Sequence, residues 1–394
     1  MNKKLISFVK YNKSLLFLYR LFGNFIVVII KPFIPIRQKQ ILFVSFGGQK
    51  FDDSPMSLFQ EMVRDTFFKD FTLIWAFSDP KKYKELTTKK IKIDTLSYYI
   101  TAMSSHIWIT NSSIERGLDL KRSKTIEINT WHGTPLKKMG DDIKNNQSYS
   151  VKRRRQSGIS LYCAQSQYDR DIFVRLFHTL PDNIIISDLP RNDALLKYSE
   201  NDIDKIKEEL RIPKGKKILL YAPTFREYDR DSLNACYIKP PVDFSKWKRE
   251  LESDYVLLFR AHYEIVNIMG IQINSFIYNV SQYPRLNDLI AISDILISDY
   301  SSIYFDYAIT EKPMLNFAYD LKEYETKRGL YLDLNKVLPC NINICEDTLL
   351  EEIKSLNFER YREKTKKFRE QFAPFSGHAV EITIERLKNL ISKN

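Results

Sequence analysis

Residues 130–140, TWHGTPLKKMG, bring together side chains suited to acid–base chemistry beside positive charge. His132 carries an imidazole, the side chain that titrates nearest neutrality, so it can take a proton from a hydroxyl group. Two lysines follow within six residues and would attract a phosphate. Gly133 and Pro135 also make the stretch a good turn, because Gly and Pro interrupt regular structure. The stretch is therefore either a catalytic segment or a turn. The predicted strands and helices around it are needed to distinguish these alternatives.

The composition indicates a globular protein with an anionic partner. The 394 residues are 44% hydrophobic and carry a net charge of +12. This length predicts two domains or one large one, and the excess charge predicts nucleic acid, anionic lipid or a phosphorylated substrate as partner. The four cysteines and five histidines have no zinc or disulfide spacing, which favours a reducing cytoplasm and no metal. Two DxD-like sequences, at residues 169–171 and 229–231, lie in charged stretches that we interpret as surface.

Residues 1–38 form a basic and apolar leader. Residues 15–36 are apolar but are interrupted by Arg20, Asn24 and Lys31. This pattern favours an amphipathic helix lying in the membrane surface, with a buried packing helix as the alternative. A membrane span is less favoured, because an uninterrupted span needs about twenty apolar residues. A signal peptide fits poorly, since no small-residue cleavage site follows.

From residue 40 onward, short apolar runs alternate with helical patterns, as in an α/β fold. Strands are expected at residues 41–46, 71–77, 106–110, 125–129, 161–164 and 184–187, and then at 217–222, 255–259, 294–298 and 313–317. Helices are expected at residues 55–66, 97–104, 166–177, 202–210 and 377–393. Gly47-Gly48 is not a dinucleotide fingerprint, so no nucleotide cofactor is predicted. His132 follows the strand at 125–129, where open α/β sheets bind their ligands.

The four strands of the second half all end in polar residues, which predicts a ligand-binding edge. Ser301 and Ser302 begin a helical pattern and would either bind an anion or cap the helix. The basic run at residues 152–155 is either a solvated face or a contact for an anionic acceptor or lipid. We expect a membrane-associating segment at 1–38, Rossmann-like domains at 39–200 and 201–375, and a helix at 376–394 that crosses back to the first domain.

Six motifs occur in order and together resemble the CDP-glycerol glycerophosphotransferase family, whose enzymes prime and polymerise teichoic acids and related capsule polymers. They are WHGTPLK (131–137), PRND (190–193), YAPTFR (221–226), RAH (260–262), SDYSSIYFDY (298–307) and YDLKEYETKRGLY (319–331). The resemblance runs from about residue 40 to the C-terminus. It implies a GT-B-like architecture, with two Rossmann-like domains facing across a cleft, and a peripheral protein on the cytoplasmic face of the bacterial plasma membrane.

The resemblance also implies roles for individual residues. His132 matches the base that deprotonates the acceptor hydroxyl, and His262 matches a second essential histidine near the donor pyrophosphate. The implied donor-binding residues are Thr224, Arg226, Arg260, Asp299, Ser301, Ser302 and Arg328. The implied acceptor-side residues are Gly133, Thr134, Lys137 and Arg191. The chain departs from the family at Tyr263, where proline is usual, and this puts the donor geometry and the polyol in question.

The implied reaction is attack of an acceptor hydroxyl on the polyol-bearing phosphorus of a CDP-alcohol, with release of CMP. The donor would carry glycerol or ribitol, the acceptor would be lipid-linked or an oligosaccharide, and an anionic membrane surface would be a further partner. The compact length of the chain, without a large extra N-terminal domain, favours a primase or capsule enzyme over a long-chain polymerase, and an oligomer is left open. One alternative is a GT-B glycosyltransferase that uses a nucleotide sugar. A basic protein that binds nucleic acid is disfavoured, because no binding module is recognised.

Overall fold

The computed structural model describes residues 12–143, 158–224, 226, 241–260, 274–374 and 377–393. The chain forms two compact units. The first consists of Met1–His132, Asn146–Arg191 and His378–Asn394, and the second of Gly133–Asn145 and Asn192–Gly377. The expected ranges 39–200 and 201–375 stay a prediction about independently folding domains. The expected α/β fold with parallel sheets is confirmed, because every strand pairing given below is parallel.

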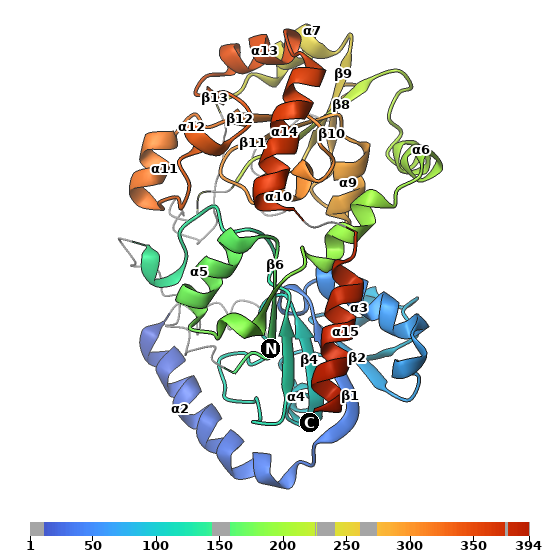
Figure 1. Cartoon of the computed structure of the whole chain (residues 1–394), viewed down its shortest axis with the longest axis vertical. Helices are drawn as coiled ribbons and strands as arrows, with labels where there is room; N and C mark the ends of the chain where they lie inside the picture. The colour runs from blue at the N-terminus through green and yellow to red at the C-terminus, as the bar shows by residue number, and fades with distance from the viewer. Residues whose placement is uncertain are drawn as a thin grey trace. The chain divides into compact units, whose positions relative to one another are not determined.

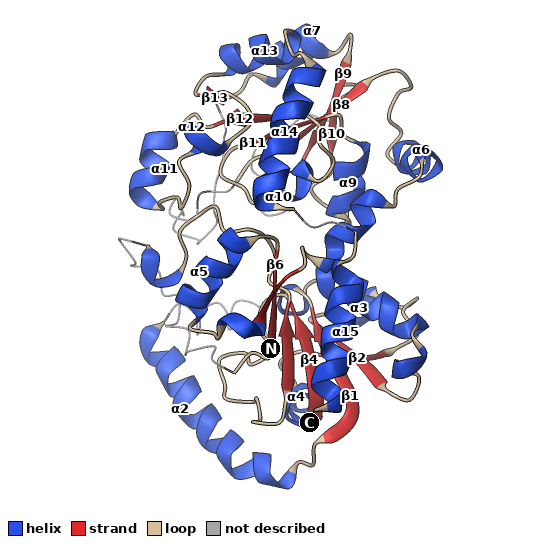
Figure 2. Ribbon diagram, viewed as in Figure 1, coloured by secondary structure: helices blue, strands red, loops and turns tan. Residues whose placement is uncertain are grey.

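The first unit contains a seven-stranded sheet with the order β3-β2-β1-β4-β5-β6-β7 (Figures 1 and 2). Its strands are β1 Arg37–Val44, β2 Thr72–Phe77, β3 Lys89–Lys92, β4 Ser105–Thr110, β5 Ile126–Asn129, β6 Leu161–Ala164 and β7 Ile184–Ile186. The order runs outward in both directions from β1, so the connections change direction between β1 and β4. That is the topological switch point at which open α/β sheets bind ligands.

Helices cover both faces of this sheet. They are α2 Lys13–Ile30, α3 Asp53–Arg64, α4 Leu96–Ser104, α5 Gln167–Phe177 and α15 Ala379–Ser392. Ile41 and Phe43 pack in one core with α3 and α15, whereas Leu42 and Val44 pack in another with α4 and α2. Because alternate strand residues point to opposite faces, two covered faces require the continuous apolar runs seen in the sequence. The expected C-terminal helix is α15, and it belongs to the first unit.

The second unit repeats this plan with six strands in the order β10-β9-β8-β11-β12-β13. They are β8 Lys217–Ala222, β9 Tyr255–Phe259, β10 Ile277–Asn279, β11 Ile295–Ser298, β12 Met314–Phe317 and β13 Ile342–Asn343. Its helices are α6 Glu200–Glu209, α7 Phe244–Leu251, α9 Leu286–Ile292, α10 Ile303–Ala308, α11 Leu321–Lys327, α12 Leu334–Val337, α13 Glu346–Lys354 and α14 Phe358–Phe372. The switch point lies between β8 and β11.

Short 3₁₀ helices complete the chain at Lys31–Phe33, Phe46–Gly48, Thr66–Phe68, Pro80–Lys82, Gly140–Asp142, Pro181–Asn183 and Pro190–Leu196. All ten strands expected from the sequence are present within a few residues. β3, β10 and β13 were not expected. They have only four, three and two residues, and β3 (KKIK) exposes two of its lysines. Such short or charged strands carry too few apolar residues to stand out in a sequence.

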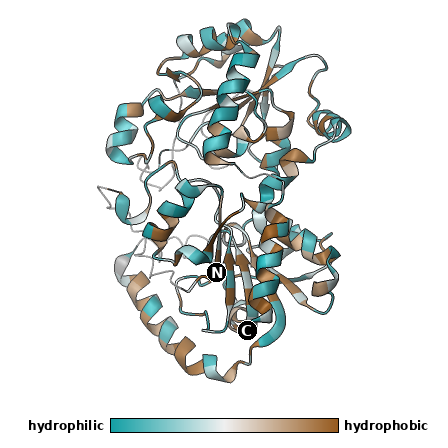
Figure 3. Cartoon of the chain, viewed as in Figure 1, coloured by the Kyte–Doolittle hydropathy of each residue, from teal (hydrophilic) through white to brown (hydrophobic). Residues whose placement is uncertain are grey.

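The described part of the leader forms α2, in which brown marks the hydrophobic residues in Figure 3. The apolar side chains of this helix are largely exposed. Phe22, Phe25 and Val28 are 60%, 66% and 69% exposed. Within the described part of the chain, Ser14–Phe33 is the one stretch long and apolar enough to cross a membrane by length and composition. Its mean apolarity reaches this level despite Arg20 and Lys31, because the apolar residues around them are large and aliphatic or aromatic.

Candidate active site

His132 lies just beyond the carboxyl end of β5, and its side chain is exposed. Its Nδ1 is 2.7 Å from the backbone carbonyl oxygen of Asn111, which follows β4. A carbonyl oxygen can only accept, so Nδ1 must carry the proton and donate it. In the neutral ring, Nε2 then holds the lone pair, and the imidazole is set to accept a proton there. This is the tautomer that a general base acting through Nε2 requires.

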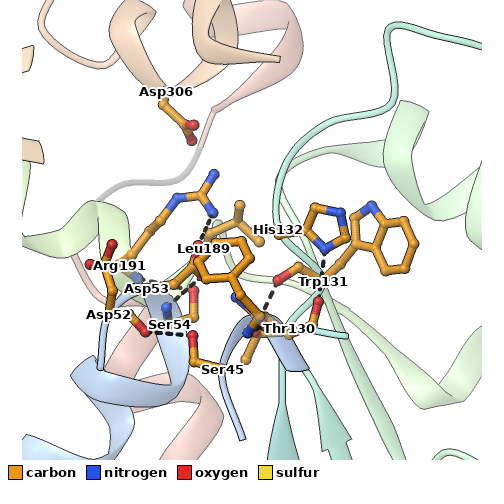
Figure 4. Close-up of polar contacts among 12 residues, drawn as sticks. Ser45, Asp52, Asp53, Ser54, Thr130, Trp131, His132, Leu189, Arg191 and Asp306 are labelled. Carbon is orange, nitrogen blue, oxygen red and sulfur yellow. Dashed lines mark hydrogen bonds and ion pairs between the residues drawn. The ribbon is translucent and has the colours of Figure 1, made fainter. Parts of the chain in front are cut away.

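Trp131, which precedes the histidine, has a strained backbone that orients the His132 side chain. Its φ of 53° is a left-handed conformation that bulky residues rarely adopt. The buried indole stacks on the imidazole, with ring centroids 4.3 Å apart (Figure 4). It also contacts Phe177, whose ring centroid lies 4.9 Å away. Asn129 Oδ1 accepts a hydrogen bond from the Trp131 N–H at 3.0 Å. Packing and hydrogen bonding thus hold a conformation that costs about 1–3 kcal/mol, as is common at functional sites.

The turn after β1 completes the surroundings of His132. Phe46, Gly47 and Gly48 have φ values of 46°, 60° and 84°. The Phe46 N–H donates to Asn111 Oδ1 at 2.8 Å, and the Gly47 N–H donates to Ser112 Oγ at 3.1 Å. The Phe46 ring lies 6.2 Å from the imidazole. The ends of β1, β4 and β5, which are neighbours in the sheet, therefore meet around the histidine at the switch point.

Arg191 belongs to a buried polar cluster in the same unit, formed with the segment that begins α3 (Figure 4). Its Nη1 donates to Asp53 Oδ2 at 2.7 Å, and its backbone N–H donates to Ser54 Oγ at 3.2 Å. Asp53 has a φ of 67°, and burial raises the pKa of the neighbouring Asp52 carboxyl. Sequence reasoning found Arg191 but missed Asp52 and Asp53. The only available signal was two adjacent acids that follow the Gly47-Gly48 turn after three intervening residues.

The remainder of the TWHGTPLKKMG stretch belongs to the second unit. Gly133 and Thr134 are buried, and Lys137 pairs antiparallel with Leu330. The Lys138 N–H donates to the Gly329 carbonyl at 3.1 Å. The implied acceptor-side residues are thus divided, with His132 and Arg191 in the first unit and the other three in the second.

At the second switch point, Thr224, Arg226 and Asp299 form one buried network. The Thr224 N–H donates to Asp299 Oδ1 at 2.9 Å, and Arg226 Nη1 donates to Asp299 Oδ2 at 2.9 Å. Arg226 Nε and Nη2 also form a bidentate pair with Asp320, at 2.6 and 2.8 Å. Burial alone would lower the pKa of Arg226, but the two carboxylates raise it above its ordinary value. Within the described residues, Thr224 Oγ1 is buried and has no hydrogen-bond partner.

The other implied donor-binding residues lie in the same unit. Arg260 Nη1 donates to the carbonyls of Val280 and Tyr283, at 3.1 and 2.9 Å. Ser301 and Ser302 are half-buried just before α10. His262 and Tyr263 lie outside the described residues.

Arg328 ends α11, and its Nη1 donates to the carbonyl of Lys138. A pocket of about 360 Å³ adjoins it, lined by Lys138 and residues 325–333. Lys138, Lys327 and Arg328 contribute positive charge to its lining, and Glu325 and Asp333 contribute negative charge. In the part of the chain that the structure describes, no cluster of His, Cys, Asp and Glu could hold a metal ion.

Comparison with known proteins decides the family. The sequence model of the CDP-Glycerol:Poly(glycerophosphate) glycerophosphotransferase family matches residues 26–389. The chain belongs to this family.

Two curated relatives show the range of lengths within the family. The teichoic acid poly(glycerol phosphate) polymerase of Staphylococcus epidermidis is 32% identical over 86% of this chain, which spans about half (48%) of that relative. The polymerase of the same name from Bacillus spizizenii is 31% identical over 96% of this chain and 98% of its own length.

Solved structures agree with this assignment. The wall teichoic acid polymerase TagF superposes with a TM-score of 0.83 at 31% identity, over 91% of this chain and 90% of that one. A histidine-to-asparagine variant of TagF, solved after a soak with CDPG, superposes with a TM-score of 0.82. A UDP-GlcNAc 2-epimerase from Neisseria meningitidis, at 12% identity and a TM-score of 0.58, shares the fold alone. Membership in the family identifies the chain as a CDP-glycerol glycerophosphotransferase-like enzyme.

Proposed function

We propose that this enzyme transfers glycerol phosphate from CDP-glycerol to a hydroxyl group of a lipid-linked acceptor in teichoic acid biosynthesis, releasing CMP. The observation that carries the mechanism is the hydrogen bond from His132 Nδ1 to the Asn111 carbonyl, which leaves Nε2 as the proton acceptor. The acceptor oxygen attacks the glycerol-bearing phosphorus while Nε2 takes its proton. General-base catalysis of this kind contributes about 10²–10⁴-fold to the rate.

The second unit supplies the donor site in this proposal, as the GT-B-like architecture of the family implies. Positioning and charge stabilisation carry phosphoryl transfer, because little covalent participation by the protein is needed. Arg260, Arg328 and His262 stabilise the negative charge that develops on the departing CMP. The Thr224 hydroxyl, which is buried and has no hydrogen-bond partner among the described residues, gains a hydrogen bond with the CDP-glycerol. Ser301 and Ser302 contact the donor phosphates.

Arg226 and Asp299 act indirectly in this scheme. Most of the Arg226 N–H groups already bond to carboxylates or to the Thr224 carbonyl. Asp299 in turn accepts the Thr224 N–H. We therefore assign both residues to shaping the loop that carries Thr224.

The exposed apolar face of α2 supports a peripheral position on the cytoplasmic face of the membrane, where a lipid-linked acceptor would be presented. Its nine large exposed apolar side chains are Phe17, Leu18, Leu21, Phe22, Phe25, Ile26, Val28, Ile29 and Ile30, and Phe33 is exposed in the 3₁₀ helix that follows. Such a face is unfavourable in water and favourable at the boundary of headgroups and acyl chains.

A donor screen tests the proposed function. The purified protein is supplied with CDP-glycerol, CDP-ribitol or UDP-sugars and a lipid-linked acceptor in detergent, and nucleotide release and product mass are measured. We expect CMP release from CDP-glycerol and a product heavier by one or more glycerol phosphate units. UDP release without CMP release would replace the proposal with a glycosyltransferase.

A further inference from the structure

The helix α2 docks on the first unit through one narrow face. Its half-buried and buried positions recur every three to four residues, at 15, 16, 19, 20, 23, 24 and 27. Gly23 faces Leu118 so closely that a Cβ added to it would lie 2.5 Å from Leu118 Cδ2. Val27 joins Leu118 in the core beneath the sheet. Gly23 therefore lies on the line along which α2 contacts the segment between β4 and β5.

Polar residues that interrupt the leader bond to that same segment. Asn24 Oδ1 accepts the Asp119 N–H at 2.8 Å. Lys31 Nζ donates to the carbonyls of Asp119 and Lys121, at 2.6 Å each, and Tyr19 donates to the Arg116 carbonyl at 3.3 Å. The sequence favoured an amphipathic helix lying in the membrane surface, with a buried packing helix as the alternative. In the structure Tyr19, Asn24 and Lys31 attach α2 to the protein. Most of its large apolar side chains are exposed.

The β4–β5 loop, residues 111–125, reaches the candidate base at its other end. Asn111 supplies the carbonyl that holds His132 Nδ1, and Asn129 Nδ2 donates to the Ser112 carbonyl at 3.1 Å. Between the two ends the loop is braced by a bidentate pair from Arg116 to Asp94, at 2.8 and 2.9 Å. Tyr98 further donates to the Ile114 carbonyl at 2.5 Å. The loop that contacts the docked face of α2 therefore also holds the histidine, and hydrogen bonds with Tyr98 and Asp94 brace it in between.

We propose that α2, through Gly23 and Asn24, is a positioning element for His132 and acts through the β4–β5 loop. The inference rests on the proposed role of His132 as general base. If α2 is displaced, the Asn111 carbonyl moves away from Nδ1, and the ring is free to carry its proton on Nε2. Nε2 can then no longer accept the proton of the acceptor hydroxyl. Displacements of about 1 Å at a reacting group can lower rates by up to about 10²-fold.

The test uses variants on the two faces of α2 in the full-length protein. In the Gly23→Ala/Asn24→Ala variant, the new Cβ at position 23 pushes against Leu118, and the oxygen that accepts the Asp119 N–H is lost. Alanine at position 23 favours the helix by about 1 kcal/mol over glycine, so an unfolded helix would not explain a loss. Adding Leu118→Ala should relieve the contact, and Asn24→Asp keeps an acceptor oxygen. Phe25→Ser, on the exposed face, is the matched control.

Two measurements separate positioning from general damage. One is CMP release from CDP-glycerol with a detergent-solubilised lipid-linked acceptor, and the other is the ¹⁵N spectrum of the His132 ring, assigned by comparison with His132→Ala. We expect the Gly23→Ala/Asn24→Ala variant to lose about ten-fold in kcat with little change in KM for CDP-glycerol, and to gain an Nε2–H signal. Leu118→Ala should partly restore both, and Phe25→Ser should match the natural protein.

An unchanged tautomer and kcat in the docking-face variant would overturn the inference, as would an equal loss in Phe25→Ser. A kcat loss without any tautomer change would also overturn it, because α2 would then act by another route. Full activity in His132→Ala would instead overturn the proposed base, whatever the α2 variants show.

Discussion

His132 and Arg226 both lie near the switch points of two similar sheets, yet their surroundings are opposite. Each lies beyond a strand that borders or neighbours the switch point of its sheet. His132 is exposed, follows a residue with a φ of 53°, and donates from Nδ1 to the Asn111 carbonyl. Arg226 has a side chain only 4% exposed and is paired with two carboxylates. The comparison teaches that a switch point can hold either a reacting group or the scaffold for one.

The largest effect is expected from His132→Ala. Removing the imidazole should lower turnover by about 10²–10⁴-fold, because no other group would accept the hydroxyl proton. CDP-glycerol binding, measured by calorimetry, should stay within about two-fold of the natural protein, since the donor residues belong to the other unit. Turnover near the natural value would show that His132 is not the base, and the contrast with Arg226 would no longer hold.

The Arg226→Ala variant tests whether Arg226 is a structural residue of the second unit. It leaves the Asp299 and Asp320 carboxylates buried without their cation, which typically destabilises a protein by about 3–5 kcal/mol. Urea unfolding of the second unit should therefore shift to lower urea concentration. Lys248→Ala is the control, because its pair with Glu252 is 37% and 48% exposed and such pairs stabilise little. If Arg226→Ala unfolds like the control, Arg226 is a ligand contact and not a scaffold.

The pH dependence of stability is expected to reveal a half-buried carboxyl group, that of Glu115, in the first unit. Burial, together with the charges of Glu127 and Asp119, raises the pKa of Glu115 from 4.5 to about 7, while Lys121 partly opposes this. Between these values the folded state binds more protons than the unfolded state, so stability falls as pH rises from about 4.5 to about 7. Glu115→Gln should remove roughly 2–3 kcal/mol of this dependence in urea unfolding at pH 5 and pH 8. A pH dependence identical to that of the natural protein would contradict the expectation.

The smallest effect on chemistry is expected from the outer face of α2. Phe22→Ser/Phe25→Ser removes two side chains that are 60% and 66% exposed. Partition onto vesicles of anionic phospholipid should fall by about ten-fold or more, because apolar burial drives such binding. Turnover with a detergent-solubilised acceptor should be unchanged. Undiminished vesicle binding would remove the support that α2 gives to a membrane-surface location.

The strands and the histidine could be predicted because their signals are local. A run such as KILLYA needs two covered faces, and its burial pattern in β8 shows this directly. Contacts between distant residues could not be predicted. Arg226 bonds to carboxylates 73 and 94 residues away, and Asn24 bonds to the backbone 95 residues away. No local pattern shows that such polar groups are already satisfied.

The place of Asp53 in the site could not be predicted from the sequence, for a related reason. Its place in the site depends on a left-handed backbone conformation and on Arg191, 138 residues later in the chain. The length of the chain also proved uninformative about primase or polymerase activity, because a poly(glycerol phosphate) polymerase matches over 98% of its own length.

The stacking of Trp131 on His132 also provides an optical reporter. The chain has four tryptophans, of which Trp75, Trp108 and Trp247 are completely buried. Trp75 and Trp108 lie in the two cores of the first sheet, and Trp247 lies in the core of the second. A positively charged ring against the indole face interacts with its π-electrons, so protonation of His132 should quench the emission of Trp131 alone. The fluorescence of the natural protein, without any attached dye, can then follow the charge of the candidate base as acceptor and donor bind.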